Sequence, residues 1–567
     1  MNPEYFSAEM RRLHQGGKEF SLAYPEQASL LNLQELRDKD PYVERLLEGV
    51  AFLTAQIREK IDDDIPEISA TLLDQLCPHL LAPMPAASIV EFNLREGSSQ
   101  KQTLPRGTLL TSDKVGPEAT ICQFASSSPV ELHPITISDL SIDETLAKGS
   151  TFKLRLQTLA GTTFNSLNLN ELKFYLHADP ALAFDLYLAL TQNLQSVQIQ
   201  CADQAQILGG QNCLTAAHFA VEDSLLPLAG RSFTGYRLLH DYFTLREKYL
   251  FVTLKGLNKI NWPGECQSLE IILHTRFSLP REHQLNKDLF RLHCTPVINL
   301  FPQDAEPINF DHQRLEYPLR ADANAAKSCL VYDVETVTGI HSQNQTRHEY
   351  EPLYALRNPQ VKHQAYYQVK RYHSAERLQQ LNLVLQNPSD DLASQRISAA
   401  INVYNGDYPR QFLQEGSLKV GSPLASSVQA TNLIRPTAML MPPQREHYQW
   451  QLITHLNLNL QTILTREALQ ALLSLYDWNP QRSDNKQRIA GISNIRYENI
   501  ERIQRGALRS GIEISLTLQE ENFASIGDRY LFANLLHQFF QTYADFNLFI
   551  CTQVMGKNGN LEWVFTA

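Results

Sequence analysis

The sequence predicts an α+β protein in which a helical N-terminal region is followed by several β-rich domains. Residues 1–85 carry apolar positions at helical spacing, whereas most of the remaining chain consists of short runs in which polar and apolar residues alternate. The chain has 567 residues, of which 43% are hydrophobic and 20% are charged. This composition is typical of a globular protein long enough to bury several cores.

The clearest helical pattern lies between Asp40 and Asp64. Its apolar residues recur at the spacing of one helix face, and they are Val43, Leu46, Leu47, Val50, Leu53, Ile57 and Ile61. Asp40 fits the N-cap of this helix and Pro41 fits its first position. Pro66 is expected to open a second helix that runs to about Leu81.

This apolar stripe has two interpretations. It fits a core helix of an ordinary helical domain, and it also fits a helix that packs against another chain. Phe52 and Leu53 lie beside Val50, so the apolar surface is wider than one narrow seam. The helical period alone favours the core helix.

Beyond Pro85 the alternating runs predict half-buried antiparallel strands. The clearest are Ser88–Leu94, Phe152–Leu156, Tyr249–Leu254 and Ser268–Leu273. Helices are expected between the strands at Pro180–Leu194, Thr465–Tyr476 and Tyr530–Tyr543.

Polar linkers mark the candidate domain boundaries. They lie at His341–His348, Gln386–Arg396 and Asn479–Gln487. We therefore expect a helical region at 1–85 and β-rich domains with inserted helices at 86–340. A middle β-rich region is expected at 341–490 and a C-terminal α+β region at 491–567.

Charge and targeting features narrow the function classes. The formal net charge of −11 disfavours a nucleic-acid partner, because neutralising phosphates needs a surplus of Lys and Arg. The N-terminus has no apolar core like that of a signal peptide, and no stretch approaches the roughly 20 apolar residues of a membrane span. We expect a cytoplasmic protein without direct membrane insertion.

The eight cysteines show no metal-binding spacing, because the closest pair is Cys201 and Cys213 and no CxxC occurs. They are predicted to be free thiols, mostly buried, in a reducing compartment. No phosphate-binding glycine loop and no linear catalytic motif is present. We expect no catalytic residue, no metal and no cofactor.

Four segments could still carry chemistry. Asp62–Asp64 is an acidic run that could hold Mg²⁺, but adjacent helical residues diverge, so a solvated helix end is favoured. Cys77–His79 and the pair His293–Cys294 bring a thiol near an imidazole without a nucleophile context, which favours packing roles.

The other two segments are a loop and a strand. Asn405–Pro409 reads NGDYP, which forms tight turns more often than ligand loops. Arg357–His373 mixes basic and aromatic residues, as single-strand nucleic-acid sites do, but it also alternates like a strand. Turn and strand are the favoured interpretations.

Several segments, in order, resemble the TssF family, also called VasA or ImpG. The most specific is DPYVERLLEGVAFLTAQIREKIDDDIPEISATLLDQLCPHLLAPMPAASIVEF at Asp40–Phe92. The other segments are Tyr5–Leu31, Gly235–Phe251, Leu292–Ile308, Arg435–Asn459 and Phe523–Phe549. One departure is Leu245–Arg246, where the family usually carries Phe-Pro.

The resemblance implies a structural subunit of the type VI secretion baseplate in a Gram-negative bacterium, with a fold similar to contractile-phage wedge proteins. Two TssF copies and one TssG would form a wedge with TssK and TssE around the VgrG hub, docked at the inner-membrane complex, where sheath and tube assembly begins. The alternative is a cytoplasmic, hydrolase-like enzyme whose site has no linear signature.

The resemblance also changes the interpretation of the N-terminal stripe. A helix shared with TssG would leave apolar residues for the partner to cover. The candidate interface residues are Leu46, Val50, Leu53 and Ile57. The C-terminal region is the candidate for contact with the second TssF copy.

Overall fold

The computed structural model describes the chain except for residues 1–2, 24–40, 96, 146–148, 160, 202–203, 228–234, 278–285, 312, 322–328, 342–345, 354–364, 374–378, 387–394, 422–423, 444–447, 457–458, 480–481, 505–506, 545–547, 557–559 and 567. The chain forms two compact units. The first comprises Met1–Leu81 and Arg445–Thr454, and the second comprises Ala82–Gln444 and His455–Ala567.

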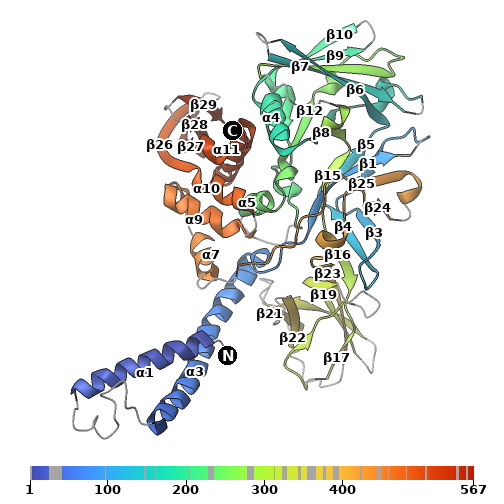
Figure 1. Ribbon diagram of the computed structural model, residues 1–567. Helices are drawn as coiled ribbons and strands as arrows, with labels where there is room; N and C mark the ends of the chain where they lie inside the picture. Colours follow the sequence, from blue (N-terminus) through green and yellow to red (C-terminus); the bar gives the residue numbers. More distant parts are fainter. Residues whose placement is uncertain are drawn as a thin grey trace. The chain divides into compact units, whose positions relative to one another are not determined.

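The first unit is helical (Figure 1). Its main elements are α1 (Pro3–Ala23), α3 (Pro41–Leu76) and η1 (Pro78–Leu80), with most of α7 (Tyr448–Leu456). Helix α1 packs against α3. Ala51 and Ala55 of α3 are fully buried, as expected where small side chains allow close contact.

The prediction of a helix break before Pro66 is wrong, because α3 continues through this proline to Leu76. A proline inside a helix removes one backbone hydrogen bond, and the remaining bonds of a long helix can offset that loss. Asp62–Asp64 therefore lies inside α3 and not at a helix end, and the side chains of this run lie outside the described residues.

A six-stranded antiparallel sheet forms one core of the second unit. Its strands, in spatial order, are β24 (Leu418–Val420), β3 (Leu109–Val115), β4 (Thr120–Ser126), β15 (Cys294–Ile298), β1 (Ala87–Leu94) and β25 (Val428–Asn432). The two end strands meet, because the Leu418 amide donates to Asn432 Oδ1 at 3.0 Å and the Gly416 amide to the Asn432 carbonyl. The sheet thus closes into a barrel around Phe92, Phe124 and their neighbours.

Two further sheets follow in the chain. The five-stranded sheet has the order β10 (Gln204–Gly209), β9 (Leu194–Cys201), β13 (Ser268–Thr275), β7 (Gly149–Thr158) and β6 (Ile135–Thr145). The four-stranded one has the order β11 (Leu214–Ala216), β12 (Phe251–Lys255), β8 (Glu171–Leu176) and β14 (Phe290–Leu292). Helix α4 (Pro180–Thr191) contacts strands of both. A short pair, β2 (Gln102–Leu104) and β5 (Val130–Leu132), stands apart.

An eight-stranded sheet is inserted between barrel strands β15 and β24. Its path is β16 (Phe301–Asp304), β23 (Gln395–Tyr404), β19 (Leu330–His341), β20 (Arg347–Pro352), β21 (Ala365–His373), β22 (Gln379–Gln386) and β18 (Tyr317–Pro318), with β17 (Ile308–Phe310) on β23. Alternate residues of β22 and β23 are buried, as the sequence pattern predicted for strands.

The C-terminal sheet has the order β26 (Ile492–Gln504), β27 (Ala507–Leu518), β28 (Leu548–Met555) and β29 (Leu561–Phe565). Near it lie α5 (Gly235–Thr244), α9 (Arg466–Tyr476), α10 (Ser483–Ala490) and α11 (Ile526–Gln541). Helix α11 packs on β28, on α4 and on α5. All ten residues of α5 are buried.

The predicted fold class is confirmed: a helical N-terminal region precedes several β-sheets with inserted helices. The helices expected near Pro180, Thr465 and Tyr530 are α4, α9 and α11. The linker expected at Asn479–Gln487 overlaps helix α10, whose last turn packs Ile489 into the core. The four predicted domain ranges stay predictions.

The prediction of eight free thiols is wrong at Cys201 and Cys266, which form a disulfide with a Cα–Cα distance of 6.3 Å. Cys201 ends β9 and Cys266 precedes β13, and these two strands are neighbours in the five-stranded sheet. The sequence could not indicate this pair, because its members lie 65 positions apart. No helix among the described residues is long and apolar enough to cross a membrane.

Candidate partner interface

Helix α3 exposes large apolar side chains to solvent. Leu46 is 69% exposed, Leu53 is 60% exposed and Val50 is 38% exposed. Ile57, the fourth predicted interface residue, lies in α3, but its side chain is outside the described residues. The structure thus brings the four candidates onto one helix and leaves the three described side chains accessible.

These residues follow the spacing of a coiled-coil seam. From Val43 the positions alternate by three and four residues through Leu46, Val50 and Leu53 to Ile57. In heptad terms, β-branched residues occupy the a positions and leucines the d positions, as in many two-stranded coiled coils. The seam is about two heptads long, which is short for an isolated coiled coil and suits a helical bundle.

The buried face of α3 is a different one. Ala51 and Ala55 are fully buried and lie about a quarter to half a turn around the helix from the seam. The helix therefore uses one apolar face inside its own unit and keeps a second one uncovered. We define the exposed seam as Leu46, Val50 and Leu53, with Ile57 next in register.

The sequence candidates for thiol chemistry fit structural roles. Burial lowers the pKa of His293 to about 3, with a smaller contribution from His133 nearby. Its Nε2 accepts a hydrogen bond from the His133 amide at 3.1 Å, so the ring is neutral. Burial also raises the pKa of the Cys294 thiol, which donates to the Leu292 carbonyl. A neutral thiol beside a neutral imidazole is not an activated nucleophile.

Cys77 and His79 are both buried, one just before and one within the short helix η1. This placement agrees with the packing role that their apolar surroundings predicted.

The NGDYP segment makes the predicted turn. Gly406 has φ +56°, and Asn405 before it is fully buried. The Asn405 amide donates to Asn299 Oδ1, and Asn299 Nδ2 donates to Asn405 Oδ1, both at 2.8 Å. Asn405 therefore ties the end of β23 to the end of β15, which is a structural role that the turn pattern did not reveal.

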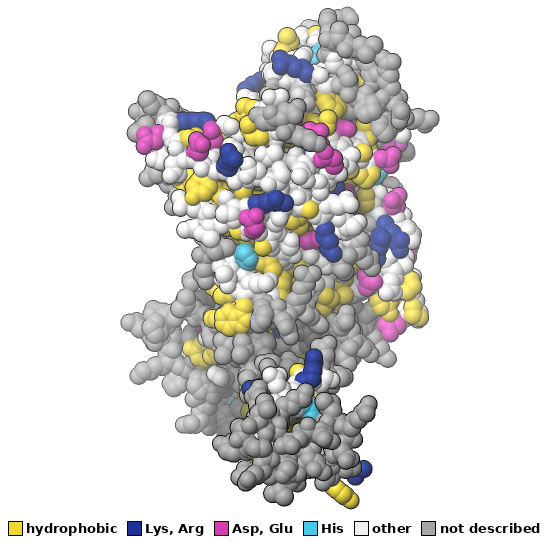
Figure 2. Space-filling view, turned by 60° about the vertical axis from the view of Figure 1, so that its left-hand side comes forward, with side chains coloured by type: hydrophobic (Ala, Val, Ile, Leu, Met, Phe, Trp, Pro, Cys, Tyr) yellow, Lys and Arg dark blue, Asp and Glu magenta, His cyan; other side chains and the backbone are white. Residues whose placement is uncertain are grey.

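The basic and aromatic residues of Arg357–His373 lie partly on β21. Lys370 pairs with Glu316 at 2.7 Å, and the Tyr372 hydroxyl donates to the same carboxylate. Residues 354–364 lie outside the described residues. On the face drawn in Figure 2, basic and acidic side chains are interspersed over the described part.

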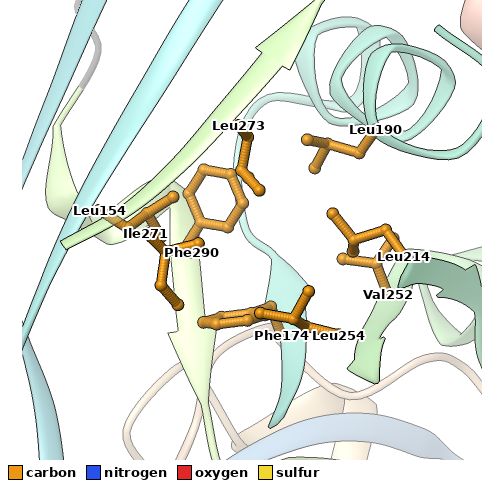
Figure 3. Close-up of a pocket in the computed structure, with 9 residues that line it drawn as sticks. All are labelled: Leu154, Phe174, Leu190, Leu214, Val252, Leu254, Ile271, Leu273 and Phe290. Carbon is orange, nitrogen blue, oxygen red and sulfur yellow. The ribbon is translucent and has the colours of Figure 1, made fainter. Parts of the chain in front are cut away.

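An apolar cavity lies between the five- and four-stranded sheets (Figure 3). Its lining consists of carbon atoms only, from Leu154, Phe174, Leu190, Leu214, Val252, Leu254, Ile271, Leu273 and Phe290. Its volume of about 10 Å³ is at the lower limit for one water molecule. Such a space is a packing defect between two sheets and offers no polar group to a substrate.

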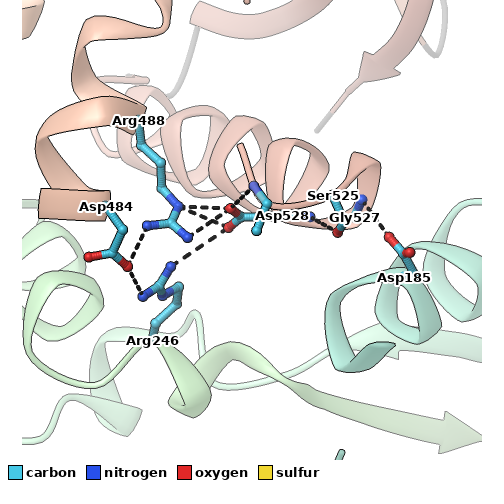
Figure 4. Close-up of polar contacts among 8 residues, drawn as sticks. Asp185, Arg246, Asp484, Arg488, Ser525, Gly527 and Asp528 are labelled. Carbon is cyan, nitrogen blue, oxygen red and sulfur yellow. Dashed lines mark hydrogen bonds and ion pairs between the residues drawn. The ribbon is translucent and has the colours of Figure 1, made fainter. Parts of the chain in front are cut away.

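A buried ion network holds the C-terminal part to the rest of the second unit (Figure 4). Asp528, near the start of α11, is fully buried and accepts from Arg488 Nε at 2.9 Å. Arg488 and Arg246 both donate to Asp484 at 2.8 Å. Arg246 also lies 3.8 Å from Asp528.

The network joins α10 and α11 to the turn after α5. Burial raises the pKa of Asp484, but the hydrogen bonds from Arg488 and Arg246 outweigh burial and hold that pKa well below its usual range. Arg246 belongs to the segment Leu245–Arg246, which is a departure from the family that the sequence resembles. Asp484 and Arg488 form a local i,i+4 pair within α10. The partners Arg246–Asp484 and Arg488–Asp528 are 238 and 40 positions apart, so no local pattern could indicate these two contacts.

No group of three or more His, Cys, Asp or Glu side chains that could hold a metal occurs among the described residues. The exposed seam of α3 is the interface candidate that the described residues present as accessible apolar side chains.

Comparisons with known proteins agree on one family. A family model described as type VI secretion system, TssF, matches residues 3–564. The type VI secretion system component TssF1 of Pseudomonas aeruginosa is 29% identical over 617 residues, which cover 99% of this chain and 98% of that protein.

Two solved structures are similar to this chain. A chain of a TssK-TssF-TssG baseplate subcomplex of the type VI secretion system, determined by cryo-electron microscopy, matches with a TM-score of 0.79 at 28% identity. The match covers 93% of this chain and 98% of that chain. A chain of the baseplate complex from the type VI secretion system matches with a TM-score of 0.64 at 25% identity, over 99% and 98% of the two chains.

Proposed function

The chain belongs to the TssF family of the type VI secretion system, and from this membership we propose that it is a structural subunit of the secretion baseplate that catalyses no reaction. The full-length match to TssF1 and the similarity to chains of two baseplate complexes carry the structural role. The His293–Cys294 pair is neutral and the cavity has a carbon-only lining, so neither of these two places is a candidate for catalysis.

The chain works in a hetero-oligomer with TssG and TssK, the subunits named with TssF in the similar subcomplex. We propose further that two copies of the chain join one TssG, and that this wedge joins TssE and surrounds the VgrG hub. The wedge would then support assembly of the sheath and the tube. Its place is the cytoplasm of a Gram-negative bacterium, with the baseplate docked at the inner-membrane complex.

We propose that the exposed seam of α3 packs against helices of TssG. The support is its exposure and its heptad spacing, because apolar residues at a and d positions pack against a partner helix in coiled coils. Burying one leucine-sized side chain contributes about 1.5–3 kcal/mol. Four such residues are therefore enough to matter in a complex.

The test replaces one seam residue by a charge. Val50→Asp would bury an unpaired carboxylate in the interface, at a cost of several kcal/mol. We expect the variant to lose co-purification with TssG from the same organism by at least about tenfold, while its thermal unfolding stays near wild type because Val50 is 38% exposed in the free chain.

Phe52→Asp is the matched control. Phe52 is also a large apolar residue of α3 and is 46% exposed, but it lies about a third of a turn or more away from the seam. We expect this variant to retain TssG. Wild-type recovery of TssG with Val50→Asp would refute the assignment of the seam.

The C-terminal region at 491–567 is our proposed contact with the second copy. Deleting it is a poor test, because α11 packs on α4 and α5 and its removal would expose their cores. Substitutions of exposed residues in this region are a better test of the contact.

A further inference from the structure

Strand β26 is a long, uncovered edge of the C-terminal sheet. It has 13 residues, and of the described strands only β27 pairs with it. Figure 1 shows β26 at the outer side of this sheet. An edge strand presents free backbone N–H and C=O groups that can pair with another strand.

Only part of this edge is accessible. Ile492 and Ile495 are buried, and Gln470 donates to the Ile492 carbonyl at 3.0 Å. From Arg496 onward the side chains are exposed up to Arg502, except for the half-buried Ile500. The free edge therefore runs from Arg496 to the end of the strand at Gln504, and its midpoint is Ile500.

The charges on this edge are not balanced within the chain. Glu498 lies directly opposite Glu513 of β27, and directly opposite like charges destabilise a strand pair. Glu498 forms no ion pair with any described residue. On the same face of the strand, Arg496 lies two residues before Glu498 and Arg502 lies four residues after it. Arg502 is 3.4 Å from Glu513 and lies over the Phe549 ring.

A second copy of β26 would place an opposite charge beside Glu498 and beside Arg502. When two free edges pair antiparallel over their full length, residue numbers opposite each other sum to twice the midpoint. Ile500 then lies opposite Ile500 of the second copy, and Glu498 lies opposite Arg502 in both directions. The pair gains one apolar contact and two ion pairs on the same face of the sheet.

Neighbouring registers fit less well. With Asn499 at the centre, Arg496 would lie opposite Arg502, and with Glu498 at the centre two carboxylates would meet. The register with Tyr497 at the centre brings Arg496 opposite Glu498, but it also pairs the segment before Arg496, where Ile492 and Ile495 are buried and α9 and α10 contact the strand.

We infer that β26 pairs antiparallel with β26 of a second copy of this chain, centred on Ile500, and joins two C-terminal sheets into one. The inference rests on the proposed function, because it names the surface through which two copies meet. Backbone hydrogen bonds supply the affinity, and the Glu498–Arg502 pairs fix the register.

The experiment reverses the charges separately and then mixes the variants. Glu498→Arg places arginines opposite Arg502, and Arg502→Glu places glutamates opposite Glu498, so each variant alone repels its own copy. We expect each to weaken pairing of the two copies by about tenfold or more. Native mass spectrometry of full-length complexes with TssG counts the copies.

Mixing is the decisive step. When both variants are co-expressed with distinguishable tags, position 498 of one lies opposite the complementary position 502 of the other, and pairing of the two different chains should return to the wild-type level. A purely intrachain effect of either substitution cannot produce this rescue. Glu501→Arg, on the other face of the same strand, should leave pairing unchanged.

The outcomes separate the two proposals. If Glu498→Arg alone keeps two copies in the TssG complex, or if the mixture shows no rescue, the strand pairing is wrong and the structural role stands. If the wild-type chain does not bind TssG at all, the proposed function fails as well. If wild type binds TssG as a single copy, the pairing through β26 is refuted.

Discussion

Buried charged residues decide how the C-terminal part of the chain is held. Asp528 is fully buried and has two arginines within 4 Å, Arg488 and Arg246. It also accepts a hydrogen bond from the Ala524 amide at 3.1 Å, so it stabilises the start of α11. Such a network is stable only when complete, because each arginine needs a counter-charge in a place that water does not reach.

Asp528→Asn should therefore lower the free energy of unfolding by about 3–5 kcal/mol, the usual loss when one partner of a buried ion pair is removed. Urea denaturation followed by tryptophan fluorescence measures it. Asp484→Asn is the control, because Asp484 is 43% exposed and water can screen the loss. Equal losses in both variants would contradict this account.

A second prediction at this scale concerns pH. Burial lowers the pKa of His218, His240 and His537 to about 4 and that of His293 to about 3. The unfolded chain binds protons to these rings near pH 6.5, whereas the folded chain does so only well below. Stability should thus be constant above about pH 6.5 and fall as the pH drops toward about 4, by several kcal/mol in total.

His240→Phe tests this prediction at one position. The ring of His240 lies 4.2 Å from that of Trp478, and phenylalanine keeps an aromatic contact there. The variant should lose less stability than wild type between pH 6.5 and 4. A pH profile of the melting temperature with an unchanged slope would contradict the assignment.

At the scale of elements, the contact between α4 and α11 depends on Gly527. A Cβ atom at this residue would lie 2.1 Å from the Phe184 carbonyl oxygen, which is far closer than a real contact. The Gly527 amide also donates to Asp185 Oδ1 at 3.0 Å. The first turn of α11 thus lies against the backbone of α4, as Figure 4 shows.

Gly527→Ala should destabilise the protein by about 1–3 kcal/mol, the range for overpacking, because backbone atoms cannot move aside cheaply. Gly49→Ala is a matched control in a helix, since nothing lies within 4 Å of its added Cβ. That variant should gain about 1 kcal/mol through higher helix propensity. Thermal denaturation of both variants measures the two changes in stability, which should have opposite signs.

The sequence predicts that a helix or strand is present where its own residues show the periodic pattern. It does not predict the residue at which the helix or strand ends. The alternation at Ser268–Leu273 predicts β13, and apolar residues at helical spacing predict α11. The helix end predicted at Pro66 was wrong. A proline usually ends a helix, but α3 continues through this one. The exposed seam could be predicted only in part, since spacing identifies an apolar face but cannot tell whether the chain itself covers it.

At the scale of the whole molecule, strand order could not be predicted from the sequence. β1 pairs with β15 and β25, and the second of these strands lies more than 300 positions later in the chain. Such pairs depend on closure of the barrel, for which no short segment carries a pattern. The disulfide between Cys201 and Cys266 and the ion pair between Arg488 and Asp528 also could not be predicted, because their partners lie far apart in the sequence.

The two amide side chains at the ends of the eight-stranded sheet have a consequence for how the chain is built. The segment Phe301–Tyr404 leaves the barrel just after Asn299 and returns at Asn405, and these two residues hydrogen-bond to each other. The chain therefore enters and leaves this segment at one place on the barrel. A cassette attached in this way can be shortened, lengthened or exchanged while the barrel strands on either side keep their neighbours.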